Sequence, residues 1–163
     1  MKTIDVDKEL EHLKQTRQRS WPKLISRLKK QLDHRMVKVA EEKGHGHFKL
    51  GYMPFLMNID LEGITNNDLS KRFGVTKQAT SKIINELVTL KYVTVAPHVD
   101  DKRSGIVYLT DRGKKFVVEA KHCGEGIMNE YRELLGKKEF DNLIDMLVKI
   151  HDYNESKGLT TYM

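Results

Sequence analysis

Residues 65–113 read TNNDLSKRFGVTKQATSKIINELVTLKYVTVAPHVDDKRSGIVYLTDRG, and this stretch decides the fold. It predicts two short helices that meet at a tight corner, followed by a two-stranded β-ribbon with a charged tip. Thr65 lies three residues before Asp68, a spacing typical of a helix start where the hydroxyl accepts a backbone N–H. Gly74 predicts the end of that helix, because glycine adopts a left-handed backbone without strain. This order indicates a winged helix-turn-helix, which places one helix in the DNA major groove.

The second helix is expected over residues 77–90, with Thr76 as its N-cap. Apolar residues at helical spacing predict its buried stripe, which comprises Ile83, Ile84, Leu87 and Leu90. The polar residues at its start and on its other side are candidates for contacts with phosphates and base edges: Thr76, Lys77, Gln78, Ser81, Lys82 and Asn85. Taken alone, this polar face fits an ordinary amphipathic helix equally well, but the corner at Gly74 favours a DNA-reading helix.

The ribbon is predicted from residues 92–97 and 106–109, which are rich in β-branched and aromatic side chains. The polar residues between these strands predict a hairpin tip that carries Lys102 and Arg103. These two cations are candidates for contact with a phosphate backbone or the minor groove, although a solvated loop also carries such residues. Because acids repel DNA, we expect either Asp100 or Asp101 to pair with Arg103 and to fix its direction.

Three segments of the chain carry a resemblance to a known family. Residues 74–82 read GVTKQATSK, residues 101–103 read DKR, and residues 109–113 read LTDRG. They resemble the MarR family of bacterial winged-helix regulators, whose recognition helix has the form GVSKQAVSR and whose wing carries DxR before LTxxG. The resemblance implies DNA contacts from the polar helix face and from Arg103, with Asp101 as the acid that orients the wing. The family usually has arginine at the position of Lys102 and often at that of Lys82, and lysine lacks the two-pronged geometry that reads guanine.

Long amphipathic helices are predicted on both sides of the winged region. We expect a mainly α (α+β) fold in a single domain, residues 1–163, in which residues 50–113 form the winged helix-turn-helix and residues 22–43 and 114–154 form dimerisation helices. Their apolar stripes exceed what one winged domain can cover, which predicts a homodimer on a pseudo-palindromic operator. Gly124 and Gly126 predict a bend or a close helix approach. Residues 5–19 predict a weak helix whose basic end either touches DNA or is solvated.

The resemblance also implies a small aromatic or phenolic effector, bound between the dimerisation helices and the winged region. Four residues of the apolar stretch 50–61 either line such a cleft or belong to the core: Met53, Phe55, Leu56 and Met57. The histidines His45 and His47 lack the usual ligand spacing, so we expect no metal site. Cys123 lies on an apolar stripe, so we expect a buried structural thiol and not a redox sensor.

Composition narrows the function further. The chain has 163 residues, 39% of them hydrophobic and 32% charged, and its net charge of +6 suits a polyanionic partner. A single cysteine fits a reducing compartment, and the chain contains neither an apolar run of membrane-spanning length nor an apolar signal segment near its start. We therefore expect a cytoplasmic protein without a membrane segment. Phosphate-loop, HExxH and GxSxG motifs are absent, which argues against an enzyme and against a cofactor.

Four functions remain open on the sequence. The favoured one is a transcriptional regulator, most simply a repressor, that a small effector releases from duplex DNA. The others are a DNA-binding protein without an effector, a winged-helix protein-interaction module, and a small enzyme. The sequence leaves the effector, the operator and the regulated genes unidentified.

Overall fold

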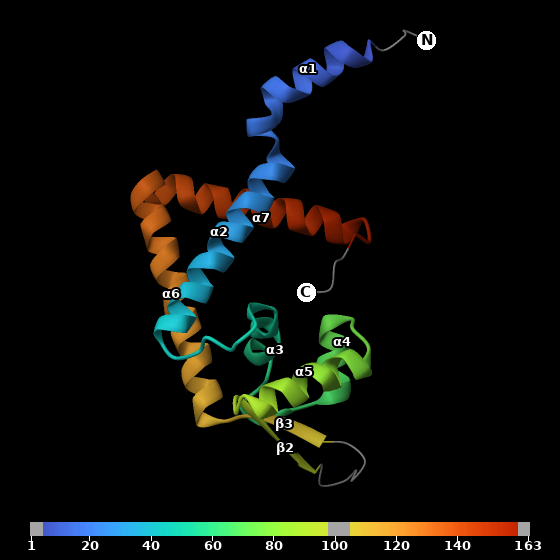
Figure 1. Cartoon of the computed structure of the whole chain (residues 1–163), viewed down its shortest axis with the longest axis vertical. Coiled ribbons are helices and arrows are strands. Elements are labelled where there is room, and N and C mark those ends of the chain that lie inside the picture. The colour runs from blue at the N-terminus through green and yellow to red at the C-terminus, as the bar shows by residue number, and fades with distance from the viewer. Residues whose placement is uncertain (1–4, 98–104, 160–163) are drawn as a thin grey trace.

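The computed structural model describes residues 5–97 and 105–159, which form a long helical scaffold and a compact winged region (Figure 1). The main elements are α1 (Val6–Thr16), α2 (Trp21–Glu42), α3 (Met53–Met57), β1 (Ile64–Thr65), α4 (Asn66–Phe73), α5 (Lys77–Thr89), β2 (Val93–Pro97), β3 (Gly105–Leu109), α6 (Asp111–Leu135) and α7 (Lys137–Ser156). Two 3-10 turns, η1 (Arg17–Arg19) and η2 (Leu50–Tyr52), precede α2 and α3. The mainly helical winged helix-turn-helix fold predicted from the sequence is confirmed.

The corner between α4 and α5 forms as its residues predict. The Thr65 hydroxyl accepts the Asp68 backbone N–H at 3.1 Å, and its own proton goes to the Asp68 carboxylate at 2.7 Å. Gly74 ends α4 in the left-handed region, with φ 56° and ψ 27°. Thr76 caps α5 by accepting the Ala79 N–H at 3.1 Å. The corner is therefore fixed by local hydrogen bonds and one glycine.

The wing is part of a three-stranded antiparallel sheet with the order β1-β3-β2. Val93 faces Leu109 and Pro97 faces Gly105 across the wing, while Ile64 of β1 pairs with Val107. A two-stranded ribbon was predicted from the sequence, without β1, because two residues carry no strand periodicity. Residues 98–104, including Asp100, Asp101, Lys102 and Arg103, lie outside the described residues.

The core of the winged region is continuous from α3 to the start of α6. Its most deeply buried apolar side chains are Leu56, Leu69, Leu87, Tyr92 and Val107. On α5 the buried residues are Thr80, Ile84 and Leu87, whereas Ile83 and Leu90 are only half-buried. All four residues of the predicted stripe therefore face the core. Thr80 also joins this face, which the sequence did not predict, with its hydroxyl donated to the Thr76 carbonyl at 3.2 Å.

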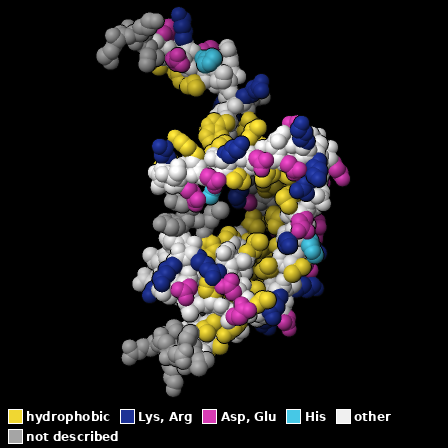
Figure 2. Space-filling view, turned by 180° about the vertical axis from the view of Figure 1, so that it is seen from behind, with side chains coloured by type: hydrophobic (Ala, Val, Ile, Leu, Met, Phe, Trp, Pro, Cys, Tyr) yellow, Lys and Arg dark blue, Asp and Glu magenta, His cyan; other side chains and the backbone are white. Residues whose placement is uncertain are grey.

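The scaffold helices expose much apolar surface. Among the described residues α1 and α2 have no buried side chain, and α7 buries only Phe140. Apolar side chains gather where α1 meets α2 and in the hollow between α7 and the winged region (Figure 2). Arg35 of α2 is held to Glu130 of α6 by two contacts of 2.6 Å. No helix in the described part of the chain has the length and apolarity that crossing a bilayer requires.

The expected close approach at Gly124 and Gly126 is not found within the described chain. Both residues lie in the uninterrupted helix α6, and a Cβ added at either would meet nothing within 4 Å. Gly113, in the first turn of the same helix, is different. A Cβ there would lie 2.1 Å from the Tyr92 carbonyl oxygen, so glycine is required where α6 packs on the base of the wing.

These two environments predict opposite effects of alanine. Gly113→Ala should lower the free energy of unfolding by about 1–3 kcal/mol, because the methyl group displaces the backbone at Tyr92. Gly124→Ala should raise it by up to about 1 kcal/mol, because alanine favours a helix interior and space is free. Urea unfolding of both variants at one protein concentration measures the difference. A tolerated Gly113→Ala would contradict the packing at this junction.

Candidate nucleic-acid interface and the cavity beside it

One side of α5 presents a row of polar side chains to solvent. Lys77, Gln78, Lys82 and Asn85 are exposed, and they line a shallow surface groove together with Ser81, Glu86 and Thr89. Thr76 is also exposed, at the N-cap of the helix. The opposite side of the helix is buried. The structure therefore brings the sequence-predicted residues of this helix together on one surface, at a helix whose N-terminal turn is free to approach DNA.

Ser81 differs from its neighbours because its hydroxyl is already engaged. It is half-buried, donates to the Lys77 carbonyl at 2.8 Å and accepts from the Asn66 amide at 2.6 Å. Asn66 lies at the start of α4, so this contact ties the two helices of the motif together. Sequence reasoning missed Asn66, since nothing in the local pattern links it to a residue 15 positions later.

Glu86, at the far end of the polar row, is held from outside α5. Lys49 donates to its Oε2 at 2.6 Å, and the Tyr52 hydroxyl donates to the same oxygen. The hydrogen bonds from Lys49 and then Tyr52 hold the pKa of Glu86 below its ordinary value, and the contact with Glu86 raises the pKa of Lys49. The carboxylate is therefore kept ionised but paired. Its partners precede it by 37 and 34 residues, so no periodicity in the sequence predicted them.

A small cavity lies between α2, the loop that follows it, α3 and α6. Its volume is about 20 Å³, room for about one water molecule. The walls are mainly apolar and include Met36, Ala40, Phe48, Leu50, Met53, Phe116 and Ala120. Of the four residues considered for an effector cleft, only Met53 lines this cavity. Phe55 and Leu56 are core residues, and Met57 is 54% exposed.

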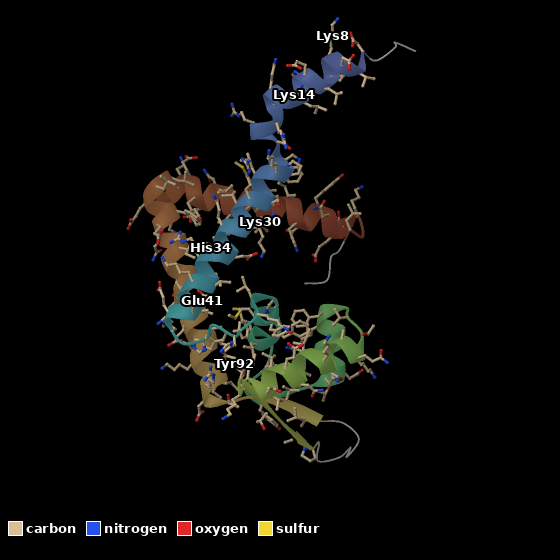
Figure 3. The ribbon with its side chains drawn as sticks, viewed as in Figure 1. Lys8, Lys14, Lys30, His34, Glu41 and Tyr92 are labelled. Atoms are coloured by element: carbon tan, nitrogen blue, oxygen red, sulfur yellow. The ribbon has the colours of Figure 1, made fainter. Side chains whose placement is uncertain are left out.

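His45 forms the polar end of the cavity and is buried. Its Nδ1 lies 2.7 Å from the Tyr92 hydroxyl, and its Nε2 lies 3.3 Å from Glu119 of α6. Tyr92 lies beside the lower part of α6, below the end of α2 that carries Glu41 (Figure 3). His45 therefore links the loop after α2 to the base of the wing. In the described residues the one cluster of three metal-ligand types is His151, Asp152 and Glu155, which is exposed on α7.

Cys123 lies beside the same cavity. It is half-buried, whereas the sequence predicted a buried thiol. It lines both the small cavity and an adjoining open groove of about 360 Å³ between α2 and α6. Glu119, with Lys43 at 3.9 Å and Lys115 at 4.0 Å, forms the charged rim between the two spaces.

Comparison with known sequences supports the assignment of residues 65–113 as a winged helix-turn-helix. A protein-family model described as MarR family matches residues 49–104, which contain the corner, α5 and the first wing strand. A curated protein of Bacillus subtilis (strain 168), the uncharacterized HTH-type transcriptional regulator YvnA, is 26% identical over 82 residues. That match covers 50% of this chain and 52% of the relative, so the chain spans about half the length of that relative.

Solved structures share the fold over most of the chain. Streptococcus pneumoniae FabT in complex with DNA has a TM-score of 0.72 at 17% identity and covers 85% of this chain and 97% of its own. The transcriptional repressor CouR bound to a 23-mer DNA duplex has a TM-score of 0.66 at 18% identity, with coverage of 83% and 95%. A MarR transcriptional regulator from Methanosarcina mazei Go1 has a TM-score of 0.65 at 25% identity, with coverage of 83% and 96%.

Proposed function

We propose that this chain represses transcription as a homodimer bound to an operator. The premise is that it is a MarR-family winged helix-turn-helix protein and thus a DNA-binding transcriptional regulator. The observation that carries the proposal is α5, whose Thr80, Ile84 and Leu87 side is buried while its polar side is exposed. A helix anchored in this way can enter a major groove without disturbing the core. The proposed place of action is the cytoplasm, where operator DNA lies.

The proposed DNA contacts divide into two groups. Gln78 and Asn85 carry amides that can donate and accept at base edges, whereas Thr76, Lys77 and Lys82 suit phosphates. Ser81 lies on the same surface, but its hydroxyl already bonds Asn66 and Lys77, so we assign it to holding the helix as well as to the interface. At the tip of the wing, residues 98–104, which lie outside the described residues, the sequence assigns phosphate or minor-groove contacts to Lys102 and Arg103 and an orienting role to Asp101.

The proposed homodimer follows from the apolar faces of the scaffold. Trp21, Leu24 and Leu28 of α2 are 42–61% exposed, and α7 exposes Leu143 and Leu147 to a similar degree. Contiguous apolar surface of this kind is typical of an interface between subunits. Two-fold pairing through α2, α6 and α7 would set the two copies of α5 about 34–36 Å apart, which is one turn of DNA.

We further propose that binding of a small effector releases the protein from DNA. The cavity beside His45 is too small for an aromatic molecule as it stands, since ligand sites usually have about 300 Å³ or more. Binding an aromatic or phenolic effector would therefore need the cavity to open toward the adjoining groove. An opened form that binds effector well and DNA poorly is what release requires. The small closed volume equally supports the alternative function, DNA binding without any effector.

Dependence on salt tests the DNA-binding proposal. If the dimer neutralises roughly six to ten phosphates, its affinity for duplex DNA should fall by about a thousandfold or more between about 50 and 200 mM salt. Fluorescence anisotropy with a labelled duplex measures this, using a sequence that the protein selects from a random pool. A protein-interaction module or an enzyme would show weak binding with little salt dependence, and that result would refute the proposal.

Two variants on one helix face separate base reading from phosphate contact. Gln78→Ala should reduce the ratio of affinities for the selected and a scrambled duplex by about 10- to 100-fold, because a base contact is lost. Lys82→Ala should weaken binding to both duplexes equally, because a phosphate carries no sequence information. Equal losses on both duplexes for Gln78→Ala would show that Gln78 does not read a base.

A further inference from the structure

The segment from Phe48 to Met53 has two sides with different surroundings. Phe48, Leu50 and Met53 form part of the cavity wall. Lys49 and Tyr52, interleaved with them, bond instead to Glu86 of the recognition helix α5. One short stretch, half of it the single 3-10 turn η2, therefore touches both the cavity and the DNA-reading helix.

The contacts on the helix side form a closed triangle. Lys49 Nζ lies 2.6 Å from Glu86 Oε2 and 3.0 Å from the Tyr52 hydroxyl, which itself donates to Glu86. Lys49 also lies over the Tyr52 ring, 5.3 Å from its centroid. Glu86 lies one helical turn after Lys82 and directly after Asn85, both proposed DNA contacts. Three mutual contacts restrict Glu86 more than an isolated exposed ion pair would.

The side chains on the cavity side of this segment are closely packed. Phe48 packs edge-on against Phe116 and Tyr92, with ring centroids 4.5 and 5.2 Å apart, and it is also edge-on to Tyr52. The free volume is only about 20 Å³, so an aromatic ligand would have to displace part of the wall. Displacement of Phe48, Leu50 or Met53 would act on the same short segment that carries Lys49 and Tyr52.

We propose that Lys49 and Tyr52 are positioning residues that hold the recognition helix through Glu86 and transmit displacement of the cavity wall to it. This inference rests on the proposed function, because it assigns the regulation of the same DNA-reading surface. With the cavity closed, the triangle holds α5 in the orientation that fits the operator. When the wall moves, the triangle opens and the helix loses that restraint, so operator affinity falls. Neither residue needs to touch DNA for this role.

Electrostatics alone predicts a different outcome for the same residues. If Glu86 acted only as an acid near phosphates, Glu86→Gln would strengthen DNA binding. If it is the anchor of α5, Glu86→Gln weakens binding to the selected duplex. Tyr52→Phe is a more specific test than Glu86→Gln, because it removes one hydroxyl, changes no charge and leaves the ring against Phe48.

The test compares Tyr52→Phe with a matched control. Tyr153→Phe removes the hydroxyl of another lysine-stacked tyrosine, with Lys157 5.6 Å from the ring, on a helix, α7, that lies apart from α5 (Figure 1). Because α7 is also a proposed dimerisation helix, gel filtration checks that this variant keeps the wild-type oligomeric state. Tyr52→Phe should lower the ratio of affinities for the selected and a scrambled duplex by about threefold to tenfold and leave scrambled binding unchanged. Tyr153→Phe should change neither. A ratio unchanged within about twofold in Tyr52→Phe overturns the proposal.

Hydrogen exchange of the α5 amides gives a readout that does not involve DNA. Tyr52→Phe should speed exchange in α5 and leave α7 unchanged, because the restraint on the recognition helix is lost. If the wild-type protein failed to bind any duplex, the proposed function would fall while this measurement still tested the restraint. Unchanged exchange in α5 would show that Tyr52 does not hold the helix.

Transmission from the cavity wall to α5 is tested through Cys123, which lines the cavity and is the chain's one cysteine. Benzyl methanethiosulfonate attaches a benzyl group there as a mixed disulfide and releases the sulfinate. The attached ring should lower operator affinity in the wild type, less so in Tyr52→Phe, and not in Cys123→Ser. No effect in the modified wild type, or an equal effect in Tyr52→Phe, would exclude transmission through this triangle.

Discussion

One face of the helix α5 is removed from solvent, and the geometry of the proposed DNA-reading surface depends on that burial. Thr80, Ile84 and Leu87 are at most 5% exposed, and the Thr80 hydroxyl is satisfied within the helix by the Thr76 carbonyl. A rotation of α5 about its axis would expose this apolar face and bury charged side chains such as Lys82, which is unfavourable. The exposed polar row therefore has a fixed direction before any DNA is present.

The surroundings of α5 restrict it at three further points along its length. Thr76 and the left-handed Gly74 set where it begins. Ser81 is tied to Asn66 near the first half of the helix, and Glu86 is tied to Lys49 and Tyr52 near the second half. The first two restraints come from inside the helix-turn-helix motif. The third comes from the segment that also walls the cavity, so it is the restraint through which a change outside the motif can reach the helix.

Local signals in the sequence predicted the parts of this fold that local interactions determine. The caps at Thr65 and Thr76 and the corner at Gly74 are confirmed, because each depends on residues within four positions. The burial of Thr80 on α5 was not predicted, because only the folded chain shows that its hydroxyl bonds the Thr76 carbonyl. The two-residue strand β1 was missed because only its pairing with Val107 defines it.

Contacts between distant residues could not be predicted in this way. His45 and Tyr92 are 47 residues apart, and Lys49 and Glu86 are 37 apart, so only the folded chain brings them together. The sequence therefore predicted the polar face of α5, which the structure shows exposed, but not the distant contacts that hold the helix. The apolar stripes of the scaffold helices were already visible in the sequence, and they predicted more apolar surface than one winged domain can cover. The exposed apolar side chains of α2 and α7 agree with this prediction.

In the proposed homodimer, two such helix faces act together on one duplex. Hydroxyl-radical footprinting of the wild-type protein on a selected operator tests it most directly, because it maps protected backbone at single-nucleotide resolution. The account predicts two protected regions related by two-fold symmetry, with centres about 10 base pairs apart. A single protected region, or two regions at an unrelated spacing, would contradict it.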